Sequence, residues 1–272
     1  MKTTEKDSFY NNLEKMNVLD ILTNINTEDK KVALIVEKSI PKISQLTNLV
    51  FEKIKSGGRL FYIGSGTSGR LGILDASECP PTFGINNDIV IGIIAGGDTA
   101  IRTAIEFAED CAESAWNDLK KYKISKKDIV IGLSASGTTP YVLGGLLKCI
   151  ENNISTGIIT CNKNSLLYNK VSCCIELIVG PEFITGSTRM KAGTAQKMTL
   201  NMITTSVMIK LGHIIDNKMV DMKLTNKKLQ VRGKKIITTK LKISEEEAES
   251  LLKRYGNVRR VIEKISNNEK KT

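Results

Sequence analysis

The chain has 272 residues and is 41% hydrophobic and 25% charged, as expected for one large globular domain with helical additions. It shows neither an apolar signal peptide nor an apolar run long enough to cross a bilayer, so we expect a cytoplasmic protein that does not enter a membrane. The single histidine, His213, argues against a His-rich zinc site and a Ser-His-Asp triad. None of the six cysteines forms a C-x-x-C pair, so reduced thiols are expected.

The net charge of +11 is concentrated at the C-terminus. Residues 216–272 contain 16 Lys and Arg against 8 Asp and Glu. Such a stretch can contact a polyanion, but it has only one aromatic residue for stacking on bases, Tyr255. Because its charges fall within helical patterns, we interpret it as a solvated face and expect no nucleic-acid partner.

Helical patterns fill residues 1–56. Thr27 is expected to cap a helix that begins with the acidic Glu28, and Pro41 to end that helix or start the next one. A stop signal follows at 56–58, with sequence Ser-Gly-Gly. We assign this region as N-terminal helices that pack on the core or on a dimer partner.

Five apolar, β-branched runs then alternate with helical patterns. Runs without polar alternation are typical of strands buried on both faces, and their alternation with helices predicts a parallel α/β sheet. The predicted strands are 59–64, 88–96, 128–136, 155–160 and 174–180. The intervening helices are expected to start at Thr67, Asp98, Thr138 and about Asn164. We assign 57–216 to this sheet domain.

One helix is predicted from Asp98 to about Lys120, because small and branched apolar residues recur there at helical spacing. Glu109 lies at the border of that apolar stripe. A border Glu is usually a surface ion-pair partner, but this is also where a catalytic carboxylate would look into a cleft.

Further helices are predicted after the last strand. A long helix should run from Ala192 to about Asp216. Another is bounded by a capping box at Ser244 and Glu247 and by a terminating Gly256. We assign 217–272 to a small C-terminal helical subdomain.

The first predicted strand leads into a G-x-G-x-x-G motif formed by Gly64, Gly66 and Gly69. A nucleotide site is a weak interpretation. A phosphate-binding loop of the Walker type has Lys after its last glycine, whereas here Arg70 follows Gly69. A dinucleotide site needs an acidic residue about 20 residues after the loop, and the candidate, Asp98, lies too far along the chain.

A second hydroxyl-rich loop, with sequence SASGTT, follows the third predicted strand at 134–139. Ligands of open parallel sheets bind at the carboxyl ends of the strands, and helix N-termini favour anions there. Two such loops predict a phosphosugar between them, although two ordinary turns with helix caps would read the same. The candidate substrate-binding residues are Ser65, Gly66, Thr67, Ser68, Ser134, Ser136, Thr138 and Thr139.

Two carboxylates are expected near the same edge. Glu78 should lie just past the helix that the first loop opens, with Pro80 and Pro81 holding the following backbone extended. Glu109 should lie on the helix after the second strand. Paired carboxylates beside a phosphosugar indicate proton-transfer chemistry.

These motifs resemble a known family, the N-acetylmuramic acid 6-phosphate etherases. The resemblance covers about 15–262, begins with NVLDILTNINTEDKKV and shares segments with the regulators of glucokinase. In those proteins the C-terminal block is followed by a further helical segment, whereas this chain ends with SNNEKKT. The matching segments are GSGTSGRLGILDASECPPTFG, IAGGDTAIRTAIEFAED, SASGTTPYV, GPEFITGSTRMKAGTAQKMTLNMITT and MVDMKLTNKKLQVRGKKI.

The resemblance implies a sugar isomerase (SIS) domain, an αβα sandwich with a five-stranded parallel sheet, in a homodimer. It implies cleavage of the D-lactyl ether of N-acetylmuramic acid 6-phosphate by water, giving N-acetylglucosamine 6-phosphate and D-lactate, without a metal or cofactor. The family's two essential carboxylates fall on Glu78, as acid, and Glu109, as base. In SIS proteins the segment before the long helix often reaches the site of a neighbouring subunit, so Glu182 and Ser187 are expected near a pocket.

Two other functions remain open from the residues. A non-catalytic phosphosugar sensor would keep the loops but would need neither carboxylate. A phosphosugar isomerase on the same fold would need a base and a phosphate site but would release no lactate.

Overall fold

The structure is a computed structural model that describes residues 2–269. The chain divides into two compact units. The first unit comprises Met1–Ala76 and Asp88–Val207, and the second comprises Ser77–Asn87 and Met208–Thr272. No helix among the described residues is both long enough and apolar enough to span a membrane.

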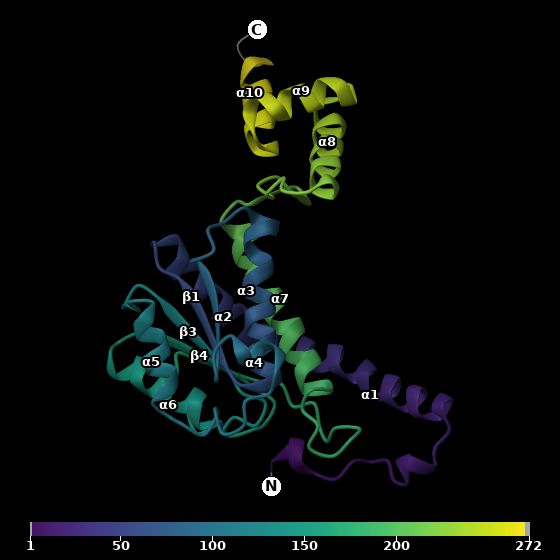
Figure 1. The fold of residues 1–272 in the computed structure, drawn as a ribbon, viewed down its shortest axis with the longest axis vertical. Coiled ribbons are helices and arrows are strands. Elements are labelled where there is room, and N and C mark those ends of the chain that lie inside the picture. Colours follow the sequence, from purple (N-terminus) through teal and green to yellow (C-terminus); the bar gives the residue numbers. More distant parts are fainter. Residues whose placement is uncertain (1, 270–272) are drawn as a thin grey trace. The chain divides into compact units, whose positions relative to one another are not determined.

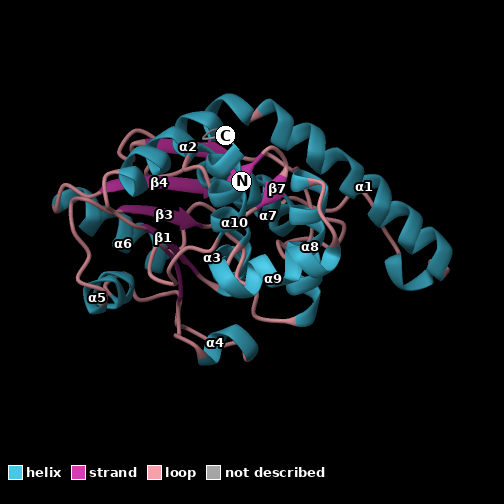
Figure 2. Cartoon of the chain, turned by 90° about the horizontal axis from the view of Figure 1, so that it is seen from above, coloured by secondary structure: helices cyan, strands magenta, loops and turns pink. Residues whose placement is uncertain are grey.

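The first unit is built on a five-stranded parallel sheet in the order β2-β1-β3-β4-β5 (Figures 1 and 2), which confirms the predicted fold class. The strands are β1 (Leu60–Gly64), β2 (Val90–Ile94), β3 (Ile129–Leu133), β4 (Ser155–Thr160) and β5 (Cys173–Glu176). The connection from β4 to β5 differs from the prediction, because no helix starts at Asn164. The backbone of Asn164 is left-handed, with φ 57°, and turns replace the helix.

Helices cover both faces of the sheet. On one face, α5 (Ser114–Lys121) and α6 (Pro140–Glu151) pack against alternate strand residues. This core includes Phe61, Ile63, Val130, Ala115, Leu119, Val142 and Leu146, all fully buried. Burial of such side chains is the main stabilising contribution to the fold.

The other face carries α2 (Ile40–Lys55) and α3 (Gly66–Phe83). Pro41 lies in the first turn of α2, as the sequence predicts. A Cβ added to Gly72 of α3 would lie 2.9 Å from the Cβ of Tyr62, so the helix packs directly on β1.

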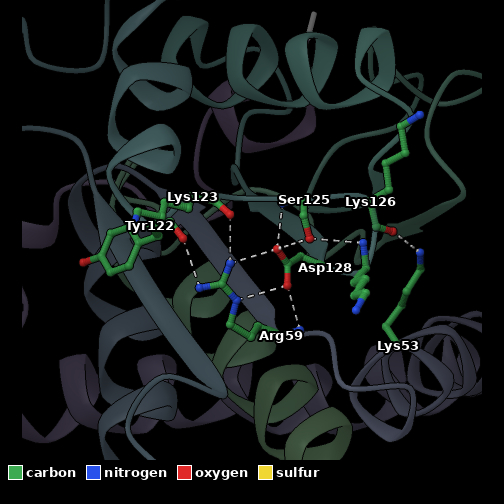
Figure 3. Close-up of polar contacts among 8 residues, drawn as sticks. Lys53, Arg59, Tyr122, Lys123, Ser125, Lys126 and Asp128 are labelled. Atoms are coloured by element: carbon green, nitrogen blue, oxygen red, sulfur yellow. Dashed lines mark hydrogen bonds and ion pairs between the residues drawn. The ribbon is translucent and has the colours of Figure 1, made fainter.

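An ion pair joins the amino ends of β1 and β3 (Figure 3). The Arg59 guanidinium donates to both carboxylate oxygens of Asp128, at 3.1 and 3.0 Å, and also to the carbonyl oxygens of Tyr122 and Lys123. Burial opposes ionisation of Asp128, but the hydrogen bonds from Arg59 and Ser125 hold the pKa of that carboxyl below its usual range. This cluster lies at the edge opposite the hydroxyl-rich loops and is structural.

The first long helix, α1 (Val18–Lys38), begins earlier than predicted. Its cap is Asn17, whose side chain accepts a hydrogen bond from the backbone N–H of Asp20 at 2.9 Å. Thr27 lies inside the helix and donates to the carbonyl of Thr23 at 2.8 Å. The prediction that Thr27 caps this helix was wrong. The helix starts at Val18, and the side chain of Asn17 caps it there by accepting from a free backbone N–H group.

The single helix predicted over 98–120 is wrong. A short helix, α4 (Thr99–Arg102), is followed by a loop before α5. Phe107 in this loop has φ 61°, which a continuous right-handed helix excludes. The backbone N–H of Tyr141 in α6 donates to the carbonyl of Glu109 at 2.9 Å. This tertiary hydrogen bond uses a carbonyl that a helix would keep for itself.

Glu78 lies inside α3 and not beyond it, and the helix continues through Pro80 and Pro81. The expected extended backbone is therefore wrong. The prolines remove hydrogen bonds only from the last turn, close to the helix end. Cys79 and Phe83, one turn apart, are only 2% and 7% exposed, so their packing offsets that cost.

The long helix α7 (Lys191–Lys210) starts close to the predicted position but ends before Asp216. Gly212, just after α7, has a left-handed φ of 87°, which does not allow the helix to continue. The next residues form a small hairpin of β6 (Ile214–Ile215) and β7 (Lys218–Met219).

The second unit contains α8 (Lys227–Leu241), α9 (Glu245–Tyr255) and α10 (Val258–Glu269). Ser244 accepts from the backbone N–H of Glu247 at 3.1 Å, and Gly256 ends α9 with φ 83°, which confirms Ser244 as the cap and Gly256 as the end of this helix. The core of this unit includes Val220, Met222, Ile236, Ile237, Ala248, Val258 and Val261.

Candidate functional site

The two hydroxyl-rich loops leave the sheet at the same edge. β1 and β3 are parallel neighbours, and Gly64 pairs with Leu133 in register. The residues that follow, Ser65 and Ser134, therefore start their loops side by side at the carboxyl ends of these strands. This is the edge at which open parallel sheets bind their ligands.

Packing explains the three glycines of the first loop. A Cβ on Gly64 would lie 2.8 Å from the backbone nitrogen of Gly69, and a Cβ on Gly69 would lie 2.6 Å from Cγ1 of Ile94. Gly66 has a left-handed φ of 49°. The motif therefore brings the start of α3 against the strands, and it does not require a dinucleotide.

Ser65 and Glu109 are joined by a short hydrogen bond, in which the Ser65 hydroxyl donates to Oε2 of Glu109 at 2.6 Å. Both residues line a cavity of about 150 Å³ at this edge. Its lining also includes Gly66, Arg70, Ala95, Ala100, Ala104, Ile105, Glu106, Phe107 and Ala108. The arrangement places a carboxylate where it can accept a proton from a small bound molecule.

The second loop is held by hydrogen bonds among its own hydroxyls. Ser134 is 2% exposed and lies 2.8 Å from the hydroxyl of Thr139, while its oxygen accepts from the backbone N–H of Gly137 at 3.0 Å. Thr138 donates to the Ser136 hydroxyl at 3.2 Å. Ser134 thus shapes the loop, and the partly exposed hydroxyls of Ser136, Thr138 and Thr139 remain at the start of α6.

Thr67 and Ser68 lie where α3 meets α7. Ser68 is 8% exposed, and its hydroxyl donates to Oε1 of Gln196 at 2.8 Å. A Cβ on Gly193 would lie 3.3 Å from Cγ2 of Thr67. Within the described residues, Nε2 of buried Gln196 has no hydrogen-bond partner. The substrate-binding role expected of Ser68 stays a prediction, because its hydroxyl is already used between the helices.

Glu182 caps α7. Its two carboxylate oxygens accept from the backbone N–H groups of Lys191 and Ala192, at 2.9 Å each. The backbone N–H groups of Ser187 and Thr188 donate within the preceding turns, to the carbonyls of Ile184 and Gly186 at 2.9 Å each. One carboxylate satisfies two free N–H groups and also interacts favourably with the helix dipole. Burial raises the pKa of Glu182, which the two backbone hydrogen bonds offset only in part.

A buried ion pair that sequence reasoning missed lies next to this cap. Lys191 Nζ is 2.6 Å from Oε2 of Glu28, and both side chains are almost fully buried. Lys31 and the hydroxyl of Tyr10 contact the other oxygen of Glu28. The pair joins α1 to the start of α7. The one sequence feature that could have predicted it is a charged Lys at the start of a helix whose neighbouring residues are small.

Glu78 is exposed on α3 in the part of the helix that belongs to the second unit. Glu109 belongs to the first unit. The pairing of these two carboxylates at one substrate therefore stays a prediction. Among the described residues, no group of three or more His, Cys, Asp or Glu side chains is arranged to hold a metal ion.

The fold and this edge define an SIS-domain protein. The family profile of the glucokinase regulatory protein N-terminal SIS domain matches 42–150, and that of the SIS domain matches 111–206. Phosphoheptose isomerase from Francisella tularensis superposes with a TM-score of 0.53 at 16% identity, covering 72% of this chain and all of that one. Phosphoheptose isomerase from Neisseria gonorrhoeae gives 0.53 at 14% identity, covering 70% and 98%. These structures share the fold.

Close relatives define the family. The N-acetylmuramic acid 6-phosphate etherase of Christiangramia forsetii is 58% identical over 97% of this chain and 96% of its own length. That of Bacteroides thetaiotaomicron is 53% identical over 97% and 95%. This chain belongs to the N-acetylmuramic acid 6-phosphate etherase family. This chain spans nearly the whole length of these two relatives.

Proposed function

We propose that this protein is an N-acetylmuramic acid 6-phosphate etherase, a carbon–oxygen lyase. It cleaves the D-lactyl ether with water and yields N-acetylglucosamine 6-phosphate and D-lactate, a step of cell-wall amino-sugar recycling. Family membership at 58% identity over nearly the whole chain supports the substrate. The hydrogen bond that holds Glu109 at the cavity wall is the structural observation that supports the chemistry.

The proposed reaction begins with removal of a proton. In the open-chain sugar the hydrogen on carbon 2 is acidic, because it lies α to the aldehyde. Glu109 is the proposed base, since its carboxylate lines the cavity and is oriented by Ser65. The resulting carbanion expels the oxygen on carbon 3 as lactate, which leaves an α,β-unsaturated aldehyde.

Glu78 is the proposed acid that gives a proton to the departing lactyl oxygen. An ether oxygen is a poor leaving group without such a proton. Water then adds to carbon 3, with the two carboxylates exchanging roles. Glu78 is exposed in the chain by itself, so this role requires bound substrate to exclude water around it.

The phosphate of the substrate is proposed to bind the second loop. Ser136, Thr138 and Thr139 present hydroxyls at the N-terminus of α6, where the positive end of the helix dipole also favours an anion. The first loop, through Ser65, Gly66 and Thr67, would then contact the sugar beside Glu109. Glu182 and Ser187 lie in the loop before α7, and in this proposal they contribute to the site by positioning that loop.

A homodimer and a cytoplasmic location belong to the same proposal. The start of α1 exposes Val18, Leu19 and Leu22, which are 71%, 74% and 59% accessible. Figure 1 shows α1 extending away from the sheet of the first unit. A second copy of the chain is the proposed partner for this apolar patch. Sedimentation tests this, and a strictly monomeric, fully active protein would contradict it.

The decisive experiment is to mix the purified protein with N-acetylmuramic acid 6-phosphate and to measure D-lactate. Stoichiometric release of lactate and N-acetylglucosamine 6-phosphate is expected. Tight binding without lactate would favour a phosphosugar sensor. Conversion of a sugar phosphate to its keto or aldo isomer without lactate would favour an isomerase.

A further inference from the structure

The N-terminal segment, residues 2–10, lies along the carboxyl edge of the sheet. Thr4 is fully buried, its backbone N–H donates to Oδ1 of Asn162 at 3.2 Å, and Nδ2 of Asn162 donates to its hydroxyl at 2.9 Å. Asn162 follows β4, and it also donates to the carbonyl of Ala135 at 2.9 Å. Ala135 belongs to the second hydroxyl-rich loop, so one buried amide joins the segment to that loop.

A second anchor lies further along the segment. Ser8 lies outside the core. Its backbone N–H donates to the hydroxyl of Thr185 at 2.9 Å, and its hydroxyl donates to the carbonyl of Phe183 at 2.8 Å. Figure 1 shows the start of the chain, in purple, beside the loop that leads into α7. The segment between Thr4 and Ser8 is therefore fixed at both ends.

These anchors carry Lys2 to the second loop, where its ammonium donates to the hydroxyl of Thr138. The loop residues 134–139 are all uncharged, so Lys2 adds a positive charge to it. In the described part of the chain, Lys2 forms no ion pair with a carboxylate. An unneutralised ammonium beside hydroxyls at a helix N-terminus is a favourable arrangement for a phosphate group.

We propose that Lys2 is a substrate-binding residue, whose ammonium contacts the phosphate monoester of the sugar together with the hydroxyls of Ser136 and Thr138. The N-terminal segment is then part of the binding site and not only a covering of the sheet edge. The identity of the sugar rests on the proposed function, whereas the contact with phosphate rests on the geometry around Thr138.

Three variants test this inference: Lys2→Gln, Lys2→Arg and, as a control, Lys6→Gln, which changes an exposed lysine of the same segment. Gln can still donate to Thr138, so Lys2→Gln isolates the charge. Calorimetry with N-acetylglucosamine 6-phosphate should show a dissociation constant about tenfold higher for Lys2→Gln, with Lys2→Arg and Lys6→Gln within about twofold of the parent. In the lactate assay KM should rise similarly, with kcat within about twofold.

A double-variant experiment tests whether the anchor acts through Lys2. Thr4→Val removes the anchor, so it should weaken binding of N-acetylglucosamine 6-phosphate in the parent but add little to the effect of Lys2→Gln. Equal binding by Lys2→Gln and Lys6→Gln would overturn the inference. If the parent binds the sugar phosphate more tightly than Lys2→Gln but releases no lactate, the etherase proposal fails and this inference stands.

Discussion

The hydroxyl of Ser65, at the end of β1, lies 2.6 Å from the carboxylate of Glu109, in the loop between α4 and α5. The two residues are 44 positions apart in the chain, and this bond brings them to one cavity wall. A carboxylate in a loop has more rotational freedom than one on a helix. The bond restricts that freedom and holds Glu109 at the wall of this cavity.

Loss of the Ser65 hydroxyl is therefore expected to impair turnover. A hydrogen bond to a charged group contributes about 1.5–3 kcal/mol. Ser65→Ala should lower kcat by at least about tenfold in the lactate assay, while Ser65→Thr, which keeps the hydroxyl, should retain most activity. An Ala variant as active as the parent would show that Glu109 needs no support from Ser65.

If proton removal at carbon 2 precedes loss of lactate, as proposed, isotope exchange separates the roles of the two carboxylates. Glu78→Gln should still exchange the carbon-2 hydrogen with deuterium from solvent while releasing almost no lactate. Glu109→Gln should lose both together. General acid or base assistance is typically worth about 10²- to 10⁴-fold, so losses of that size are expected by NMR and lactate assay.

Glu106→Gln is the matched control, since Glu106 lines the same cavity but has no assigned role. Its rate should stay within about threefold of the parent. If Glu78→Gln stops exchange and Glu109→Gln preserves it, the acid and base assignments are reversed. If neither change costs even about tenfold, both carboxylates are ordinary surface charges.

Ser136 offers a test of the phosphate loop. Its hydroxyl lies at the N-terminus of α6 and accepts from the backbone N–H of Thr138 at 3.2 Å. If it binds the phosphate equally in the ground and transition states, Ser136→Ala should raise KM about tenfold and leave kcat nearly unchanged. Initial-rate kinetics measure both constants. A fall in kcat without a change in KM would place Ser136 in the chemical step instead.

Close packing of α6 on the Glu109 loop gives another prediction. A Cβ on Gly144 would lie 2.0 Å from the carbonyl oxygen of Ala112, so Gly144→Ala must displace the loop backbone. Activity should fall at least about tenfold, and the free energy of unfolding should fall by about 1–3 kcal/mol. The control, Leu147→Ala, changes a partly exposed side chain of α6. Full activity of Gly144→Ala would mean that the loop position does not matter.

The buried pair of Glu28 and Lys191 predicts a pH-dependent stability. Burial alone would raise the pKa of Glu28, but hydrogen bonds from Lys191 and Lys31 outweigh it and hold the pKa below its ordinary value. The stabilisation is therefore complete above the unfolded-state pKa of about 4.3 and is lost as the pH falls through the lower folded-state pKa.

Glu28→Gln should accordingly lower the free energy of unfolding by about 3 kcal/mol at neutral pH, because it leaves Lys191 buried without its counter-charge. Urea denaturation should show this difference shrinking below about pH 4. Glu37→Gln, an exposed change on the same helix, is the control. A difference that is constant from pH 7 to pH 3 would contradict a role for the charge of Glu28.

The sequence alone determined the parallel sheet, because continuous β-branched runs alternating with helices have few other solutions. It also determined which edge carries the two hydroxyl-rich loops and the end of α9 at Gly256, since these depend on strand polarity and local backbone preference. The inferences about the sheet, the loops and the end of α9 needed no contact between distant residues. The domain boundaries at 57 and 217 and the pairing of Glu78 with Glu109 stay predictions.

Tertiary structure decided the rest. The apolar stripe around Glu109 predicts a helix, yet the hydrogen bond from Tyr141 holds this stretch as a loop. Pro80 predicts an extended backbone, yet the burial of Phe83 keeps the helix intact. Glu182 caps α7 from outside the helix, where local cap patterns give no signal. In each case a contact made only after folding outweighed a local preference worth about 1–3 kcal/mol.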